Sequence, residues 1–422
     1  MNRREIISTL LIVLVVFSYV GVTMAEPVEK VRVIVTIDKS SFDERAIDDV
    51  GGQVKIRYKI ISAVVVEIPK HAVKKLRAVR GVKKVEYDSE VYLLGKPSGV
   101  GKPKPPQPPQ TIPWGIDRIN ASEAWNITTG ESNGTIEVAI LDTGIDYDHP
   151  DLADNIAWAV SVVRGKVSTN PALYKDRNGH GTHVAGTVAA LNNDIGVVGA
   201  APEVEIYAIK VLGNGIISSW SDLILGIEQA LLGPDGVLDS DDDGIIVGDP
   251  DDDAAEVISM SLGGDAPPDA LWDVIEAAYT YGVVLVAAAG NEGADNPSYP
   301  AAYPEVIAVG ATDIEDQVPD WSNRNPEIAA PGVDVLSTYP DDTYATLSGT
   351  SMAAPHVSGV VALIQAVYYN NNGIVLPVGT EDDSTTDTVR GILHTTADDM
   401  GDSVLYGYGI VRADLAVQTA SG

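Results

Sequence analysis

From residue 112 onward the chain alternates short apolar runs with longer segments that carry apolar residues at helical spacing. The apolar runs are nearly continuous, as expected for strands that are buried on both faces. They occupy residues 137–141, 204–211, 256–262, 283–288 and 306–309, and helical segments such as 180–192 and 220–232 separate them. This alternation predicts an α/β fold with a mostly parallel sheet and helices on both faces. The functional site of such a sheet lies beyond the carboxyl ends of its strands.

Residues 26–94 follow another pattern and predict a separate small unit. The predicted strands lie at 31–37, twice within 54–68, at 82–87 and at 91–94, and the predicted helices lie at 41–50 and 71–79. The order βαββαβ is that of a ferredoxin-like α+β module. On its own, such a module could be an independent binding domain.

Two segments flank this unit. Residues 1–25 carry Arg3 and Arg4 before a nearly all-apolar run and end in small residues, which is typical of a secretory signal. An uncleaved membrane anchor is the alternative, although the apolar run is short for a span. Residues 95–111 are rich in Gly, Pro and Lys and predict an extended linker before a domain at 112–422.

The composition narrows the class of partner. The 422 residues include 60 Asp and Glu against 28 Lys and Arg, which gives a formal net charge of −32. Nucleic-acid binding needs a basic surface, so this charge argues against a nucleic-acid partner. The absence of cysteine excludes disulfides, thiol catalysis and thiolate metal sites. A secreted protein of this composition must be stabilised by packing, ion pairs or bound metal.

Four polar residues stand at predicted element junctions. Asp142 ends a strand, His180 opens a helix, Asn291 follows a strand, and Ser351 precedes the apolar run 357–364. The Asp and Asn could merely form turns, and the Ser could be a helix cap. A nucleophilic Ser instead needs a base and donors for the oxyanion. The chain order Asp, His, Asn, Ser supplies them in one of the few known triad orders.

The motifs around these residues resemble the three signatures of the subtilisin-like serine proteases. They read Asp142-Thr143-Gly144, His180-Gly181-Thr182-His183-Val184-Ala185-Gly186 and Gly349-Thr350-Ser351-Met352-Ala353-Ala354-Pro355-His356-Val357. The resemblance covers roughly residues 112–420 and is strongest to the calcium-dependent subtilisins of hyperthermophilic archaea. It implies a subtilisin-like fold and a serine endopeptidase that acts on proteins and peptides.

The resemblance also implies a role for each residue. Ser351 attacks the scissile carbonyl, His180 takes its proton and later gives it to the leaving amine, and Asp142 orients His180. The side chain of Asn291 and the N–H of Ser351 hold the oxyanion. The other two motif histidines are then structural. A zinc site at His180 and His183 is disfavoured, because no third ligand stands at the usual spacing.

Further segments acquire a function through the same resemblance. Ser261-Leu262-Gly263 resembles the edge strand onto which a substrate adds as a β-strand. Residues 26–94 resemble the propeptide that assists folding and then blocks the cleft. Its end, residues 91–94, would lie in the cleft as a product, so we expect cleavage between Leu94 and Gly95.

Two loops resemble calcium sites, so more than one Ca²⁺ is expected. In the acidic insert 233–254, a D-x-D-x-D-G opening is followed by Pro250 where an EF-hand needs Glu, so a neighbouring Asp must close the shell. The expected ligands there are Asp239, Asp241, Asp243, the carbonyl of Ile245, Asp249 and Asp252. In the second loop they are Gln110, Asp151, Leu191, Asn193, Ile195 and Val197. The alternative for the insert is a disordered acidic loop.

The sequence thus predicts a secreted, extracellular, self-processing and calcium-stabilised endopeptidase that acts as a monomer. The absence of Cys, the many acids and the archaeal resemblance also suggest heat stability. A catalytically inactive binding protein on the same fold is the main alternative. A lipase-type hydrolase would need G-x-S-x-G and the order Ser, Asp, His, neither of which is present.

Overall fold

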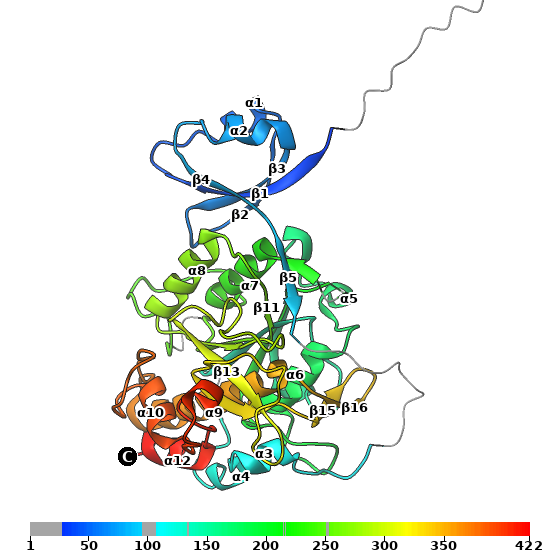
Figure 1. Cartoon of the computed structure of the whole chain (residues 1–422), viewed down its shortest axis with the longest axis vertical. Helices are drawn as coiled ribbons and strands as arrows, with labels where there is room; N and C mark the ends of the chain where they lie inside the picture. The colour runs from blue at the N-terminus through cyan, green and yellow to red at the C-terminus, as the bar shows by residue number, and fades with distance from the viewer. Residues whose placement is uncertain (1–27, 95–106, 133–134, 214, 216, 250–252) are drawn as a thin grey trace, which may run out of the picture.

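The computed structural model describes residues 28–94, 107–132, 135–213, 215, 217–249 and 253–422. The predicted signal, residues 1–25, lies outside the described residues, as do Gly95 and Asp252. A small N-terminal unit, residues 28–94, stands at one end of a larger main body, which comprises the described residues from 107 onward (Figure 1). Its last strand, β5 (Glu90–Leu93), runs down into the main body.

Four described strands of the N-terminal unit form an antiparallel sheet in the order β2-β3-β1-β4. The elements are β1 (Lys30–Ile37), α1 (Arg45–Asp49), β2 (Gln53–Arg57), β3 (Ala63–Pro69), the 3-10 turn η1 (Lys70–Ala72), α2 (Val73–Leu76) and β4 (Val82–Tyr87). They follow the predicted order βαββαβ. On β1, Val33 and Val35 pack under the unit's own helices, whereas Ile34 packs toward the main body. Both faces of the sheet are therefore covered.

The two helices of this unit are shorter than predicted from 41–50 and 71–79. The Asp38 carboxylate accepts the Ser40 N–H at 3.0 Å and the Ser41 hydroxyl at 3.0 Å, so the chain turns there and α1 begins only at Arg45. Such side-chain bonds compete with helix formation. Near the end of the second helical segment, Gly81 has a φ of +83° and turns the chain into β4.

The main body is built on seven described parallel strands in the order β14-β13-β12-β10-β6-β8-β7. They are β6 (Glu137–Asp142), β7 (Ile156–Ser161), β8 (Glu205–Lys210), β10 (Val257–Met260), β12 (Val284–Ala288), β13 (Val306–Thr312) and β14 (Ile328–Pro331). The predicted parallel sheet is thereby confirmed. The interior positions of its central strands are mostly apolar because both faces are buried.

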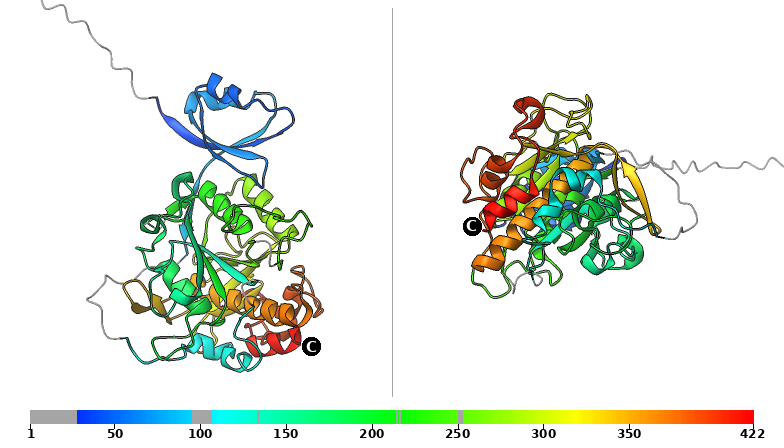
Figure 2. Two further views of the ribbon diagram at one scale, coloured as in Figure 1. Left: turned by 180° about the vertical axis from the view of Figure 1, so that it is seen from behind. Right: turned by 90° about the horizontal axis from the view of Figure 1, so that it is seen from below.

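Helices cover both faces, as predicted. On β6, Val138 and Ile140 join one core cluster, whereas Ala139 and Leu141 join the other. The first cluster packs under α6 (His180–Ala189), α9 (Thr350–Asn372), α10 (Val389–Thr396) and α12 (Ala413–Ala420), and the second under α7 (Trp220–Leu232) and α8 (Asp269–Thr280). Figure 2 shows α9 and α12 side by side in orange and red.

Among the described residues, α9 is the one helix that is long and apolar enough to cross a membrane, with a mean hydropathy of 1.3. Its apolar window is entirely buried inside the protein. Its composition therefore fits a central core helix that touches β10, β12, β13 and β14.

Short elements complete the main body. They are α3 (Trp114–Arg118), α4 (Ala121–Ala124), η2 (Ala153–Asn155), η3 (Val163–Gly165), α5 (Pro171–Tyr174), β9 (Ile217–Ser219), β11 (Leu262–Gly263), β15 (Val335–Tyr339), β16 (Thr343–Leu347) and α11 (Ser403–Tyr406). The described end of the predicted linker lies against a neighbouring loop, although Pro108, Pro109 and Thr111 are exposed. Pro109 pairs with Ile195 and Thr111 with Val197, because this segment satisfies its backbone groups on the neighbouring loop.

Two carboxyl groups meet at the amino-terminal edge of the sheet, opposite Asp142. Glu137 begins β6, Glu256 immediately precedes β10, and both are buried. The Glu256 carboxylate accepts the N–H groups of Glu137 at 2.8 Å and Gly248 at 2.9 Å. Burial raises the pKa of Glu137, and the adjacent Glu256 raises it further. Burial also raises the pKa of Glu256. We therefore expect the pair to keep one proton at pH values at which exposed carboxyl groups are ionised.

We therefore expect Glu137→Gln to stabilise the protein at alkaline pH. In the unfolded chain both groups lose their protons near their ordinary pKa of about 4.3. The folded state keeps a proton to higher pH, so its stability falls as the pH rises above about 4–5. The amide introduced by the substitution would still donate a hydrogen bond to Glu256, and it would not need to take up a proton to do so. Chemical unfolding should give about 1–3 kcal/mol of gain at pH 8 and almost none at pH 4.5.

The matched control is Glu276→Gln on the exposed face of α8, which should change the stability little at either pH. An equal gain from Glu137→Gln at both pH values would contradict the shared-proton interpretation.

Candidate active site

The predicted site residues gather at the carboxyl edge of the sheet. Asp142 is the last residue of β6, Asn291 follows β12, and His180 and Ser351 stand in the first turns of α6 and α9. Because parallel strands end at one edge, residues up to 209 positions apart in the sequence reach the same place. Sequence order alone could not bring them together; the sheet does.

The pair Asp142–His180 is fully buried. His180 Nδ1 lies 2.9 Å from each carboxylate oxygen of Asp142. Nδ1 therefore carries the proton in the neutral ring, and Nε2 is the basic nitrogen. Within the described residues Nε2 has no hydrogen-bond partner. Gly181 makes the approach of α6 possible, because a methyl group there would overlap Gly144 O and lie 3.0 Å from an Asp142 oxygen.

Ser351 is not the cap of α9. Gly349 is the N-cap residue and no side chain caps this helix, so the capping alternative is wrong. The Ser351 hydroxyl donates to Ser261 O at 3.0 Å, and the Ser261 hydroxyl donates to Ser351 O at 2.8 Å. The expected contact with His180 is thus replaced in this state by one to the backbone. For His180 to act as the predicted base, the Ser351 side chain would have to turn away from Ser261 O.

Asn291 points its amide nitrogen into the cleft. Its Oδ1 accepts the Thr350 N–H at 2.9 Å and the Thr350 hydroxyl at 3.0 Å. With the oxygen held in this way, Nδ2 must face the other side, where it donates to Leu94 O. Thr350 was not singled out in the sequence, although it stands next to Ser351 in the motif. By holding Oδ1, Thr350 ensures that the amide nitrogen of Asn291, and not its oxygen, faces a bound peptide.

The chain's own strand β5 reaches the predicted site residues. It pairs antiparallel with β11, Leu93 opposite Leu262 and Tyr92 opposite Gly263, so the predicted substrate-binding edge strand is paired with a segment of the same chain. Its other edge pairs with β9, which the sequence did not predict. Leu94 is buried, and a methyl group on Gly263 would lie 3.0 Å from its Cδ1. Glycine at position 263 leaves room for the side chain of Leu94.

The remaining motif histidines are engaged by backbone carbonyls. His183 Nε2 lies 2.9 Å from Val335 O, and His356 Nδ1 lies 2.8 Å from Met352 O. Burial lowers the pKa of His183 to about 3 and that of His356 to about 4. Both rings are therefore neutral and serve the packing of α6 and α9.

One predicted calcium loop folds around a buried carboxylate. Asp151 accepts the Asn193 amide at 2.9 Å and the Val197 N–H at 3.0 Å. Burial raises its pKa to about 6. Gln110 reaches the same loop, but its Nε2 donates to the carbonyls of Leu191 at 2.8 Å and Val197. Its oxygen, the atom expected to bind the cation, faces away because the nitrogen satisfies these carbonyls. The Asn193 Oδ1 accepts the N–H of Ile195 at 2.8 Å.

The acidic insert gathers three of its predicted ligands. Oxygens of Asp239, Asp241 and Asp243 lie within 4.8 Å of one another, and Asp239 Oδ1 is buried without a partner among the described residues. The Ile245 N–H donates to Asp243 at 2.7 Å, which curls the loop. Asp249 does not belong to the described group, because the buried residues after Ile245 carry the chain back toward the sheet.

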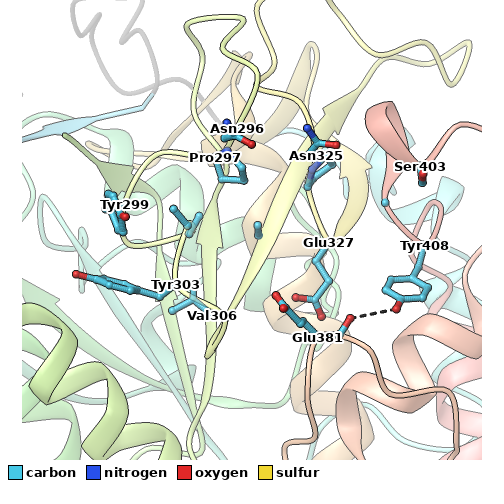
Figure 3. A pocket seen from close by; sticks show the side chains of 15 residues that line it. Asn296, Pro297, Tyr299, Tyr303, Val306, Asn325, Glu327, Glu381, Ser403 and Tyr408 are labelled. Carbon is cyan, nitrogen blue, oxygen red and sulfur yellow. Dashed lines mark hydrogen bonds between the residues drawn. The ribbon is translucent and has the colours of Figure 1, made fainter. Parts of the chain in front are cut away.

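A hollow of about 860 Å³ lies beside β13 and β14, away from these residues (Figure 3). Tyr299, Tyr303, Glu327 and Tyr408 are among its lining residues. The Glu327 carboxylate is already used by Arg390, with Nε at 2.9 Å, and by the His394 ring at 2.8 Å. We therefore place the chemistry at Asp142 and His180 and not in this hollow.

Comparison with known proteins identifies the family of the chain. A sequence model described as the subtilase family matches residues 133–409. Subtilisin Savinase of Lederbergia lenta is 42% identical over 311 residues, which cover 73% of this chain and all of the relative. M-protease of Shouchella clausii is 38% identical over 363 residues, 86% of this chain and 80% of the relative.

The thermostable alkaline protease of Halalkalibacterium halodurans is 35% identical over 420 residues, 98% of this chain and the whole of the relative. The match with that relative includes most of the N-terminal unit and the main body. The chain therefore belongs to the subtilase family of serine endopeptidases.

Proposed function

We propose that this endopeptidase is made as a secreted precursor, cuts itself between Leu94 and Gly95, and is then inhibited by its N-terminal unit until that unit leaves. The observation that carries the proposal is the contact of Leu94 O with the Asn291 amide nitrogen. A peptide carbonyl oxygen that lies on an oxyanion donor has the position expected for the carbonyl of the bond to be cut. The pairing of β5 with both β9 and β11 supports the same interpretation.

In the proposed mechanism, Ser351 attacks the carbonyl carbon of the residue in the position of Leu94. Its hydroxyl turns from Ser261 O and gives its proton to His180 Nε2, because Nδ1 is held by Asp142. The Asp142 carboxylate stabilises the imidazolium that forms. His180 then protonates the leaving amine, and water, activated by the same ring, hydrolyses the acyl-enzyme. His180 thereby returns to its starting state.

Asn291→Ala should reduce kcat of the released enzyme by about 10²–10³ and change KM only a few-fold, the range established on the corresponding asparagine of subtilisin itself. The amide acts on the charge that develops in the transition state, and the bound substrate carries little of it. Steady-state kinetics on a fluorogenic peptide would measure both constants. A rise in KM at unchanged kcat would mean that Asn291 only binds substrate.

The contacts between the N-terminal unit and α7 support an inhibitory role. The Asp88 carboxylate accepts the Ser221 N–H at 3.0 Å and the Ser221 hydroxyl at 2.7 Å, and Arg32 pairs with it at 3.2 Å. In return, the Glu228 carboxylate of α7 accepts the Ile60 N–H at 2.6 Å. Charges buried at an interface are tolerated when they are paired in this way.

Self-processing is tested by refolding residues 26–422 as wild type and as Ser351→Ala, with and without calcium. We expect the wild type to yield a fragment that ends at or near Leu94, identified by mass spectrometry, whereas Ser351→Ala stays whole. Ser421→Ala, at the exposed carboxyl terminus, is the matched control and should process normally. If both folded proteins stay whole and neither digests casein, the inactive binding protein becomes the better interpretation.

We further propose that both loops bind Ca²⁺. The donor sets are carboxylate and carbonyl oxygens, which Ca²⁺ prefers. The three clustered carboxylates of the insert repel one another unless a cation neutralises them, and the unpartnered Asp239 Oδ1 fits a missing ligand. Asp239, Asp241 and Asp243 would hold one ion, and Asp151 with Asn193 another. Bound ions would raise the free energy of unfolding by an amount that grows with the logarithm of the calcium concentration relative to Kd.

The double substitution Asp241→Asn/Asp243→Asn should abolish calcium binding at the insert and lower the melting temperature in calcium by several degrees, measured by calorimetry in the Ser351→Ala background. EDTA should lower the melting temperature of the parent and have less effect on the variant. Asp265→Asn, an exposed change outside both loops, is the control. A parent melting below about 60 °C in saturating calcium would contradict the proposed heat stability.

Secretion rests on the signal-like residues 1–25, which support export and extracellular action. We also propose that the enzyme acts as a monomer on protein substrates.

A further inference from the structure

A second carboxylate, Asp176, lies buried beside the catalytic pair and has no part in the mechanism above. It stands between α5 and α6 and gathers five donor groups. They are the N–H groups of Asn178 at 2.8 Å, Gly179 at 3.0 Å and Thr182 at 3.1 Å, and the hydroxyls of Thr143 at 3.0 Å and Thr182 at 2.7 Å. Asp176 thus serves the amino-terminal turn of the helix that carries His180.

Thr143 links this carboxylate to both members of the pair. It directly follows Asp142, and its hydroxyl oxygen accepts the Gly181 N–H at 3.0 Å while its proton goes to Asp176. The residue after Asp142 is therefore bonded to the residue after His180. These bonds therefore resist a shift of α6, which carries His180, relative to β6, which carries Asp142.

A buried cation closes the network from the other side. Lys210 ends β8, stands opposite Asp142 in the strand register and is 3% exposed. Its ammonium donates to Thr143 O and, at 3.3 Å, to Lys175 O, which immediately precedes Asp176. Burial lowers the pKa of Lys210, while Asp176 and Asp142 raise it. The exposed Arg177 lowers the pKa of Lys210 as well, and the buried Asp146 nearby is paired with Lys175 at 2.7 Å. Asp142, Asp176 and Lys210 are thus buried charges close to His180.

We propose that Asp176 and Lys210 are positioning residues that hold Asp142 and His180 in register and set the charge that His180 meets when it takes the proton. The proposal rests on the proposed role of His180 as the base. A ring at a helix amino terminus is disfavoured as a cation, because the helix dipole presents its positive end there. The Asp176 carboxylate lies on the N–H groups of that same end and offsets it. The positive charge of Lys210 acts in the opposite direction to Asp176 and disfavours the imidazolium.

Because Asp176 and Lys210 carry opposite charges, their removal should move the acid limb of the pH profile of kcat/KM in opposite directions. Asp176→Asn removes a negative charge, so the imidazolium is less favoured and the limb should move down by about half to one pH unit. Lys210→Met removes a positive charge, so the limb should move up by a similar amount. Asp176→Asn should also lower kcat by about 10-fold and change KM by less than two-fold. The reason is that the NH2 group of the new amide would face N–H and hydroxyl donors of α6, which a carboxylate accepts.

The measurement uses the processed enzyme and a fluorogenic peptide from pH 5 to 10. Asp154→Asn and Lys166→Met, exposed changes of the same charge, are matched controls. At 0.5 M salt their small shifts should vanish, because solvent screens exposed charges, whereas the buried pair should keep most of its effect. Asp176→Glu, which keeps the charge, should leave the limb near its wild-type position.

Shifts in one direction for both variants, or a loss of kcat with no shift in either, would overturn the proposal and leave a purely structural network. If Asp176→Asn does not fold, as judged by near-UV circular dichroism in the Ser351→Ala background, Lys210→Met decides alone, because its limb must move upward. A failure of the proposed base would give a different result. If His180 is not the base, His180→Ala should keep its activity and the acid limb of the wild type.

Discussion

Parallel strands that are buried on both faces can offer polar chemistry only at their ends. The seven-stranded sheet has apolar central strands because helices cover each side, so a carboxylate such as Asp142 is tolerated only where β6 stops. The same constraint puts Asn291 after β12 and leaves the amino termini of α6 and α9 at that edge. The close approach of the reacting groups is thus a consequence of how the core is covered.

Buried charge is the second theme of the molecule. Asp142 is paired with His180, Asp176 is surrounded by five donors, and Lys210 is placed among carbonyls. Where two buried carboxyl groups adjoin, as at Glu137 and Glu256, burial raises the pKa of both and so favours their protonated forms. At Asp239 we propose instead that a set of carboxylate oxygens binds a cation. Each buried carboxyl group is thus stabilised by hydrogen-bond donors, by a proton or, as we propose, by a metal ion. The dependence of the enzyme on pH and on calcium would therefore be set by single side chains.

The sequence predicted much of this arrangement because its evidence is local. Asp142, His180 and Ser351 lie in contiguous motifs, and the strand runs of both parts reflect burial directly. What it missed depends on contacts between distant residues. The three residues of β9 are a strand only because β5 pairs with them, and Asp176 gains its meaning from donors that the turn of α6 brings together. The rotation of the Ser351 hydroxyl and the facing of the Gln110 amide are likewise set by neighbours far along the chain.

The middle position of β5 in its three-stranded sheet has a consequence for what such an enzyme can cut. Recognition on both edges is made by backbone N–H and C=O groups, which every polypeptide possesses. If a substrate binds as β5 does, as we propose, an extended stretch of its chain must pair with both β9 and β11 before its bond can be cut. In a folded target this requires local unfolding. The local stability of the target's fold would then decide where the enzyme cuts more than the target's amino-acid sequence does.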